Sequence, residues 1–169
     1  MTKTGDRKLP AFKGLSWHRE KHFSFFRPID WVRFDWLDDR QGVLFGPSAG
    51  DNATLFAVDV KDLETEITTA DLDDLFTGFV TGIERLPDSQ IESRQKWVAG
   101  AVIGLEAKYL FRENEVIRKR WIRVLYQDTR QITVTAQGAT AADFDYWLPM
   151  FFEAMMTFKI HTNSTKRKG

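Results

Sequence analysis

The chain has 169 residues, of which 43% are hydrophobic and 28% charged, and it contains no cysteine. This is the composition of one globular domain with a substantial core, and the missing cysteine excludes disulfides, thiolate metal sites and cysteine nucleophiles. Basic and acidic residues number 24 each, so the formal charge is zero and no global attraction to nucleic acid or anionic membranes is expected.

Both ends of the chain are basic and lack apolar periodicity. We therefore expect solvated tails at residues 1–13 and 161–169, and a single domain over residues 14–160. The first residues lack the apolar run of a signal peptide, and no stretch approaches the twenty apolar residues of a membrane span. These features predict a cytoplasmic location without membrane insertion.

Several short runs in the first third of the chain have the composition of strands. The runs are residues 15–17, 22–27, 32–34, 43–45 and 54–61. Residues 22–27 are rich in aromatic side chains that favour strands, and Pro28 ends that run. In residues 54–61, apolar and polar side chains alternate, which is typical of a half-buried strand.

Residues 101–126 contain the clearest pattern in the sequence. Apolar side chains fall on alternate positions of residues 101–112, and residues 116–126 are rich in Ile, Val and aromatics. Between them, Asn114 suits a turn position with positive φ, so we predict an antiparallel hairpin with one face in the core. Strands over residues 91–98 and 132–136 are expected on either side of this hairpin in the sequence.

Two amphipathic helices are predicted. The first has Thr68 as its N-cap, an apolar stripe at steps of three and four residues, and an end at Leu86-Pro87. The second starts after Thr140, with Asp143 three residues on. Pro149 lies inside this second helix, where we expect a kink or a restart because proline removes a hydrogen bond.

This order of elements resembles the PsbP-like superfamily, which includes PsbP, the Mog-type Ran-binding proteins and the DcrB-like proteins. Two segments carry the resemblance: residues 23–31, an aromatic strand followed by proline and tryptophan, and residues 148–159, a closing helix with a Thr-Phe pair. The resemblance implies the α+β class and an α/β/α sandwich. Its central antiparallel sheet would have about six or seven strands, flanked by two main helices.

The resemblance also implies a kind of role. Members of this superfamily serve mostly as photosystem accessory subunits, a Ran partner, envelope lipoproteins or chaperones for secreted effectors, and mostly not as enzymes. The chain has no cysteine for a lipid anchor, and no residues match a Ran-binding or manganese-related site. The fold alone is therefore a weak guide to function.

Three segments resemble metal- or phosphate-binding sites, but a structural explanation accounts for each of them better than ligand binding does. His18 and His22 would lie roughly 13 Å apart on a strand, too far for one metal ion. The three aspartates at positions 71, 73 and 74 suit the positive end of the first helix, which explains them without a cation. Residues 46–50 lack the lysine-threonine pair of a phosphate loop. We therefore expect no cofactor and no metal.

Two clusters are candidates for a partner surface. The run from Arg118 to Arg123 places four cations and Trp121 in one strand; it either tracks a phosphate backbone or forms a solvated sheet face, and we favour the second. The aromatics near residue 31 either mark a turn or remain exposed for a partner. Together the candidate residues for a partner surface are Trp31, Phe34, Trp36, Arg118, Arg120, Trp121 and Arg123.

From these observations we predict a non-enzymatic domain that binds a protein segment, as an adaptor or a chaperone does. The partner is not identified by the sequence, and we do not expect nucleic acid to be the ligand. One alternative is a small-molecule-binding or hydrolytic protein that gathers scattered residues such as Asp59, Glu106 and Arg123. A deep, closed pocket would favour that alternative, and a shallow groove the adaptor. The other alternative is a homodimer formed through an exposed sheet edge or face.

Overall fold

The computed structural model describes residues 10, 13–36, 38–51 and 53–161. Most of the two predicted tails, namely residues 1–9, 11–12 and 162–169, lies outside the described residues. The chain divides into two compact units, one from Val32 to Asp145 and one from the segments up to Trp31 and from Tyr146 onward. No described helix is both long enough and apolar enough to cross a membrane.

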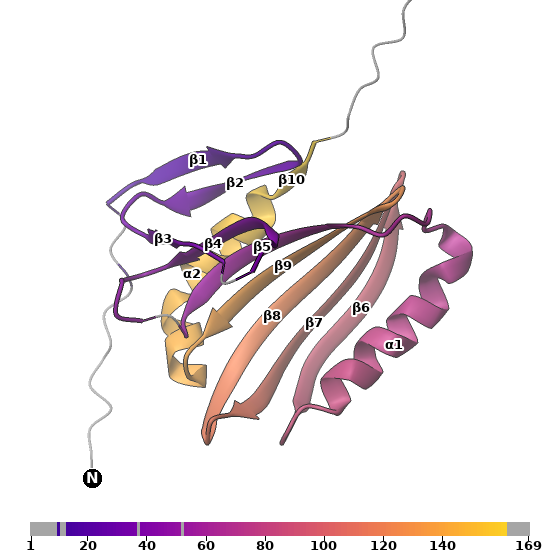
Figure 1. Cartoon of the computed structure of the whole chain (residues 1–169). Coiled ribbons are helices and arrows are strands. Elements are labelled where there is room, and N and C mark those ends of the chain that lie inside the picture. Colours follow the sequence, from indigo (N-terminus) through magenta and orange to yellow (C-terminus); the bar gives the residue numbers. More distant parts are fainter. Residues whose placement is uncertain (1–9, 11–12, 37, 52, 162–169) are drawn as a thin grey trace, which may run out of the picture. The chain divides into compact units, whose positions relative to one another are not determined.

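The larger unit contains a seven-stranded antiparallel sheet with the strand order β3-β4-β5-β9-β8-β7-β6 (Figure 1). Its strands are β3 (Val32–Phe34), β4 (Gln41–Gly46), β5 (Leu55–Asp62), β6 (Gln90–Ala99), β7 (Val102–Glu113), β8 (Val116–Gln127) and β9 (Arg130–Gly138). A short 3-10 helix η1 (Thr69–Asp71) leads into α1 (Leu72–Glu84). Strands β3 and β6 are the two edges of this sheet.

The β7–β8 hairpin is the longest pairing in the sheet and runs from Val102 opposite Gln127 to Glu113 opposite Val116. The two residues of its turn, Asn114 and Glu115, have φ angles of 50° and 63°. Positive φ at both central positions defines the type I′ turn, whose twist matches that of the flanking strands. The predicted hairpin and the positive φ of Asn114 are therefore confirmed.

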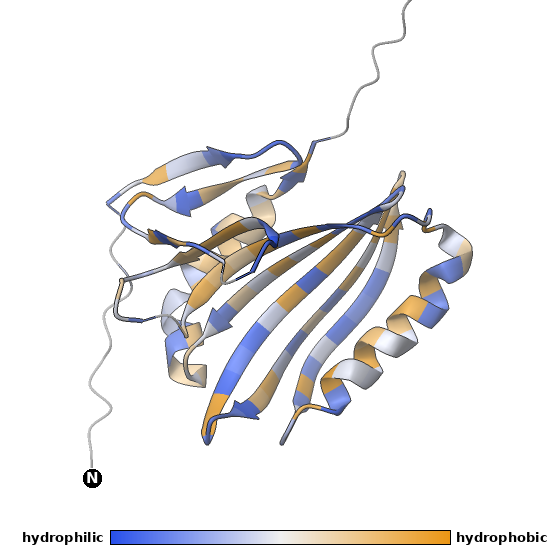
Figure 2. Cartoon of the chain, in the orientation of Figure 1, coloured by the Kyte–Doolittle hydropathy of each residue, from blue (hydrophilic) through white to orange (hydrophobic). Residues whose placement is uncertain are grey.

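Helix α1 packs on one face of the sheet, over β6 and β7. Its apolar stripe, including Phe79 and Ile83, contacts buried side chains at alternate positions of β7 and β8. These strand residues are Ile103, Leu105, Ala107, Tyr109, Phe111, Val124 and Tyr126. The hydropathy colours in Figure 2 show the same alternation along the strands. We call this side of the sheet the α1 face.

The opposite face of the sheet is also apolar over β4, β5 and β9. Its side chains include Val43, Phe45, Phe56, Val58, Ile132, Val134 and Ala136, all at most 3% exposed. At the end of β9, Thr140 caps the helix α2 (Ala141–Thr157), because its Oγ1 accepts a hydrogen bond from the Asp143 amide at 3.1 Å. The assignment of α2 continues through Pro149, so the helix does not restart there.

The smaller unit contains a three-stranded antiparallel sheet. Its strands are β1 (Leu15–Arg19), β2 (Phe23–Pro28) and β10 (Lys159–Ile160), with β2 in the middle. Phe158 stacks on Phe23 and Phe25 of β2, with ring centroids 5.6 and 6.2 Å away. Thr157 at the end of α2 accepts a hydrogen bond from the Phe26 amide at 2.9 Å, so the aromatic strand and the closing helix stabilise each other.

The predicted α+β class, the antiparallel sheet and the two main helices are confirmed. Two features differ from the prediction. Residues 15–19 and 23–28 form a separate small sheet instead of joining the large one, and residues 159–160 pair with β2. A strand of two residues has no periodicity, so only its pairing partner reveals it.

Candidate functional site

Helix α1 leaves the other half of the α1 face uncovered, and an open basin of about 520 Å³ lies there. It is lined by Trp36, Arg40, Leu44, Ala53, Leu55, Ala57, Glu113, Asn114, Arg118, Arg120, Thr135 and Gln137. We call it the arginine basin, because three arginines and one glutamate give its lining a formal charge of +2. All of these residues belong to the larger unit.

The register of the sheet explains why these side chains meet. Arg120 of β8 lies opposite Gln137 of β9, and Gln137 lies opposite Leu55 of β5. Side chains of directly paired residues emerge on the same face of a sheet. The row therefore crosses three strands at the floor of the basin, and the neighbouring row adds Thr135 and Ala57 in the same way.

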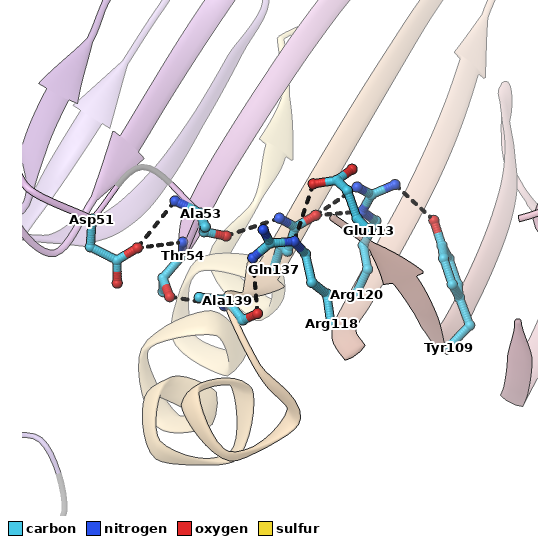
Figure 3. A network of polar contacts seen from close by, with 9 residues as sticks. All are labelled: Asp51, Ala53, Thr54, Tyr109, Glu113, Arg118, Arg120, Gln137 and Ala139. Atoms are coloured by element: carbon cyan, nitrogen blue, oxygen red, sulfur yellow. Dashed lines mark hydrogen bonds and ion pairs between the residues drawn. The ribbon is translucent and has the colours of Figure 1, made fainter. Parts of the chain in front are cut away.

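Arg120 is held in place by neutral partners. Its Nε and Nη2 donate to Oε1 of Gln137 at 2.9 and 2.6 Å, and its Nη1 donates to the Tyr109 hydroxyl at 3.1 Å (Figure 3). The guanidinium carbon also lies 4.4 Å from the centre of the Phe111 ring. Within the described residues, Arg120 contacts no carboxylate, so its charge is not neutralised locally.

Arg118 lies two residues earlier on the same face and is paired differently. Its Nε donates to Oε1 of Glu113 at 3.1 Å, and its Nη1 donates to the Ala139 carbonyl at 2.9 Å (Figure 3). The type I′ turn brings Glu113 back beside this strand. The side chain of Arg118 is 11% exposed and that of Glu113 is 48% exposed, so the arginine is buried while its carboxylate partner remains open to solvent.

A chain of hydrogen bonds fixes the rim of the basin between β5 and β9. Asp51 accepts hydrogen bonds from the amides of Ala53 and Thr54, and the Thr54 hydroxyl oxygen accepts one from the Ala139 amide (Figure 3). The side-chain amide of Gln137 donates to the Ala53 carbonyl at 2.9 Å. Gln137 is thereby oriented with its side-chain oxygen toward Arg120.

Solved structures show which fold this is. The chain superimposes on cyanobacterial PsbP (CyanoP) from Synechocystis with a TM-score of 0.65 at 13% identity. The match covers 93% of this chain and 100% of CyanoP. The chain has a PsbP-like fold. LpqN, involved in cell envelope biogenesis of Mycobacterium tuberculosis, matches 88% of the chain and 91% of its own length, with a TM-score of 0.62 at 12% identity.

A third similar structure is PA94 from Pseudomonas aeruginosa, a protein of unknown function. It matches 85% of this chain and 94% of its own length, with a TM-score of 0.57 and 15% identity. No family model matches the sequence, and no curated protein gives a significant match. At such low identities the likeness extends to the fold, and the resemblance inferred from the aromatic strand and the closing helix is confirmed at that level.

The PsbP-like sheet brings some of the predicted partner-surface residues together. Trp36, Arg118 and Arg120 line the arginine basin. Phe34 does not line the basin, but it lies opposite Leu44 in the sheet, and Leu44 is a lining residue. Trp31 lies in the smaller unit, where it is 6% exposed and packs edge-on against Trp147 and Phe151.

Trp121 and Arg123 lie on the opposite face of β8 from Arg118 and Arg120, because successive side chains alternate. There, Arg123 donates to Glu106 at 2.7 Å, and Lys108 lies 4.4 Å from the centre of the Trp121 ring. The run from Arg118 to Arg123 is thus divided between two faces and does not form one continuous cationic row. The alternation of side chains along a strand is the sequence signal that separates Arg118 and Arg120 from Trp121 and Arg123.

Sequence reasoning missed Gln137, which orients Arg120, and Arg40, whose guanidinium carbon lies 4.8 Å from the centre of the Trp36 ring. The scattered residues named for the alternative, a small-molecule-binding or hydrolytic protein, do not converge on one site. Asp59 lies opposite Thr133 on the α1 face, whereas Glu106 and Arg123 pair on the other face. The described residues contain no group of three or more histidine, aspartate or glutamate side chains placed to hold a metal ion.

Proposed function

We propose that this PsbP-like chain is a non-enzymatic binding domain that holds a segment of a partner protein in the arginine basin. The observation that carries this proposal is the uncovered half of the α1 face, where an open basin combines apolar walls with hydrogen-bond donors held in place. A preorganised site loses little conformational entropy when it binds a ligand. The accessory and chaperone roles implied by the fold agree with this proposal.

The shape of the basin supports a protein segment as the occupant. It is open to solvent, and its lining combines the apolar side chains of Trp36, Leu44 and Leu55 with arginines. An extended segment can place an apolar side chain against such walls while its backbone remains outside. Aromatic and arginine side chains together are typical of the residues that dominate protein interfaces.

A filling substitution tests this proposal. Peptides selected from a random library displayed on phage would be measured against the full chain, Thr135→Trp and Thr133→Trp. Thr135 lines the basin, whereas Thr133 lies one pleat along the same face of β9, outside the lining. We expect Thr135→Trp alone to weaken binding. Peptides that bind all three proteins equally, or a library without binders, would contradict the proposal.

A small organic ligand is the second candidate for the same basin. A volume of about 520 Å³ lies within the range of roughly 300–1,000 Å³ found for small-molecule sites. Arg118, Arg120 and Gln137 would then supply the polar contacts. A fragment screen against the unchanged protein, Thr135→Trp and Thr133→Trp tests this second function. Because fragments and peptides are measured in separate experiments, the result for one class of ligand does not depend on the other.

A homodimer formed through an exposed sheet edge or face is the remaining alternative, and a cytoplasmic location is a further part of the proposal. Strand β6 is one edge of the large sheet, and most of its residues are exposed. Its charged residues Glu92, Arg94 and Lys96 oppose uncontrolled edge pairing. Light scattering at several concentrations tests the dimer, and cell fractionation tests the location.

A further inference from the structure

The three arginines of the basin differ in how their charge is balanced. Arg118 is paired with Glu113, and Arg40 with Asp38 at 3.1 Å. Within the part of the chain that the structure describes, Arg120 donates only to the neutral groups of Gln137 and Tyr109. When Glu113 of the lining and the neighbouring Asp38 are both counted, one arginine of the basin has no carboxylate partner in the described part of the chain, and that arginine is Arg120.

The guanidinium of Arg120 also has hydrogen-bonding capacity left. It has five N–H groups, and its three hydrogen bonds to Gln137 and Tyr109 use three of them. An arginine cannot release its proton at ordinary pH, so the charge persists in this half-buried position. A bound anion would both neutralise the charge and accept the remaining hydrogen bonds.

A second donor of the same basin lacks an acceptor. The indole Nε1 of Trp36 is inaccessible to solvent and has no hydrogen-bond partner among the described residues. A buried N–H without an acceptor costs free energy, so this part of the lining is held under an unmet demand for an acceptor. Arg120 provides the donors for a ligand oxygen, and the indole ring of Trp36 and the apolar side chains of Leu44 and Leu55 lie in the same lining.

We infer that the arginine basin recognises a carboxylate on an Asp or Glu side chain of the partner segment, bound to Arg120, beside an apolar side chain of that segment. This inference rests on the proposed function for the identity of the occupant. A planar carboxylate carries one negative charge and two acceptor oxygens, which match a guanidinium. A phosphate group carries nearly twice that charge and would exceed the single unpaired cation.

The open form of the basin decides between a side chain and a chain end. A segment can pass across an open basin and insert a side chain, so the segment need not terminate there. Selected peptides therefore would be compared with a free or amidated C-terminus and with Glu→Gln or Asp→Asn changes. We expect the loss of the side-chain carboxylate to weaken binding by about tenfold or more. Loss on amidation alone would contradict this assignment.

Small probes test the carboxylate chemistry without any peptide. The full chain, labelled with ¹⁵N, would be titrated with 3-phenylpropionate, 3-phenylpropionamide and phenyl phosphate while the Arg Nε–H and Trp Nε1–H signals are followed. We expect the carboxylate to shift the signals of Arg120 and Trp36 at lower concentration than either other probe. Equal shifts with the amide, or tighter binding of the phosphate, would overturn the inference.

Variants complete the test. Arg120→Gln removes the charge, Arg120→Lys keeps the charge without the planar fork, and Arg94→Gln makes the same charge change on exposed β6. We expect binding of 3-phenylpropionate to be lost with Arg120→Gln, weakened with Arg120→Lys and unchanged with Arg94→Gln. Equal loss with Arg94→Gln would indicate a general charge effect and refute the site.

The two proposals fail in different ways. If 3-phenylpropionate binds at Arg120 and no peptide does, the carboxylate site stands and the protein-segment function fails. If peptides bind in the basin but tolerate the loss of every carboxylate, the proposed function stands and the inference fails. A destabilised Arg120 variant does not blur this result, because the comparison of acid with amide uses the unchanged protein.

Discussion

Arg120 donates two hydrogen bonds to a single oxygen of Gln137, from Nε at 2.9 Å and from Nη2 at 2.6 Å. Gln137 is 5% exposed and donates its own amide to the Ala53 carbonyl. One buried side chain thus connects β8, β9 and the loop before β5. Removal of the Gln137 side chain would take away two hydrogen bonds of Arg120 and leave the Ala53 carbonyl without this donor.

Gln137→Leu tests this relationship. We expect the free energy of unfolding to fall by about 2 kcal/mol, because a buried acceptor and donor lose their partners. The matched control is Gln131→Leu on the same face of β9, where the side chain makes no hydrogen bond within the described residues. Urea unfolding measures both changes, and equal losses for the two variants would contradict the role of Gln137.

Gly42 is required by the close approach of β4 to β5. Its φ is +132°, and a Cβ at this position would lie 1.8 Å from the carbonyl oxygen of Val58. Because backbone must move to relieve such an overlap, we expect Gly42→Ala to lower stability by more than about 3 kcal/mol. Gly50→Ala, with nothing within 4 Å of its Cβ, should change stability by less than about 0.5 kcal/mol. Thermal unfolding of both variants decides the point.

Trp97 of β6 packs directly on Gly104 of β7, and a Cβ on Gly104 would lie 2.2 Å from the indole ring. Gly104→Ala should therefore displace Trp97, shift its fluorescence to longer wavelength and lower stability by about 1 kcal/mol or more. In a Trp97→Ala background, the same glycine change should cost much less. A double-mutant cycle without coupling would show that the ring does not occupy this space.

The carboxyl group of Asp59 makes the stability of the folded state depend on pH. Burial raises the pKa of its carboxyl above the ordinary value, Arg40 opposes the rise, Asp38 adds to it and Lys61 opposes it. The folded state thus holds this proton more tightly than the unfolded state does. The resulting stability is present below the ordinary pKa and is lost as the pH rises through the folded value.

Asp59→Asn cannot ionise and avoids this loss. We expect the variant to gain stability relative to the unchanged protein between pH 3 and pH 7, measured as urea midpoints at both values. Asp39→Asn makes the same charge change at an exposed position and serves as the control. A gain that is as large for Asp39→Asn, or a relative loss for Asp59→Asn toward pH 7, would show that burial of Asp59 is not the cause.

Much of the larger unit follows from local sequence patterns. The β7–β8 hairpin is predicted because its apolar side chains alternate and Asn114 suits the turn, and the start of α2 follows from Thr140. Thr68 instead precedes the 3-10 helix η1, and α1 begins at Leu72 with Asp71 as its N-cap. The separate small sheet could not be predicted, because β1 and β2 are neighbours in sequence but their third strand comes from the far end of the chain and leaves no local signal. Strand β10 is the extreme case, since its two residues are defined only by pairing with β2.

Only part of the candidate site can be predicted from the sequence, because long-range strand pairing brings the other part together. Arg118 and Arg120 were identified by their charge, but the run from Arg118 to Arg123 was treated as one surface, although alternation separates its two faces. Gln137 and Leu55 join the basin only through the pairing of β8, β9 and β5. The uncovered half of the α1 face depends on where α1 packs, which local periodicity does not specify.

The affinity of a selected peptide for Thr135→Trp, relative to Thr133→Trp, tests the central claim most directly. Both variants add the same bulk to the same face of β9, but only the first fills the arginine basin. Isothermal titration calorimetry should show binding at least about tenfold weaker for Thr135→Trp and unchanged for Thr133→Trp. Equal affinities for the two folded variants would contradict the assignment of the binding site to this basin.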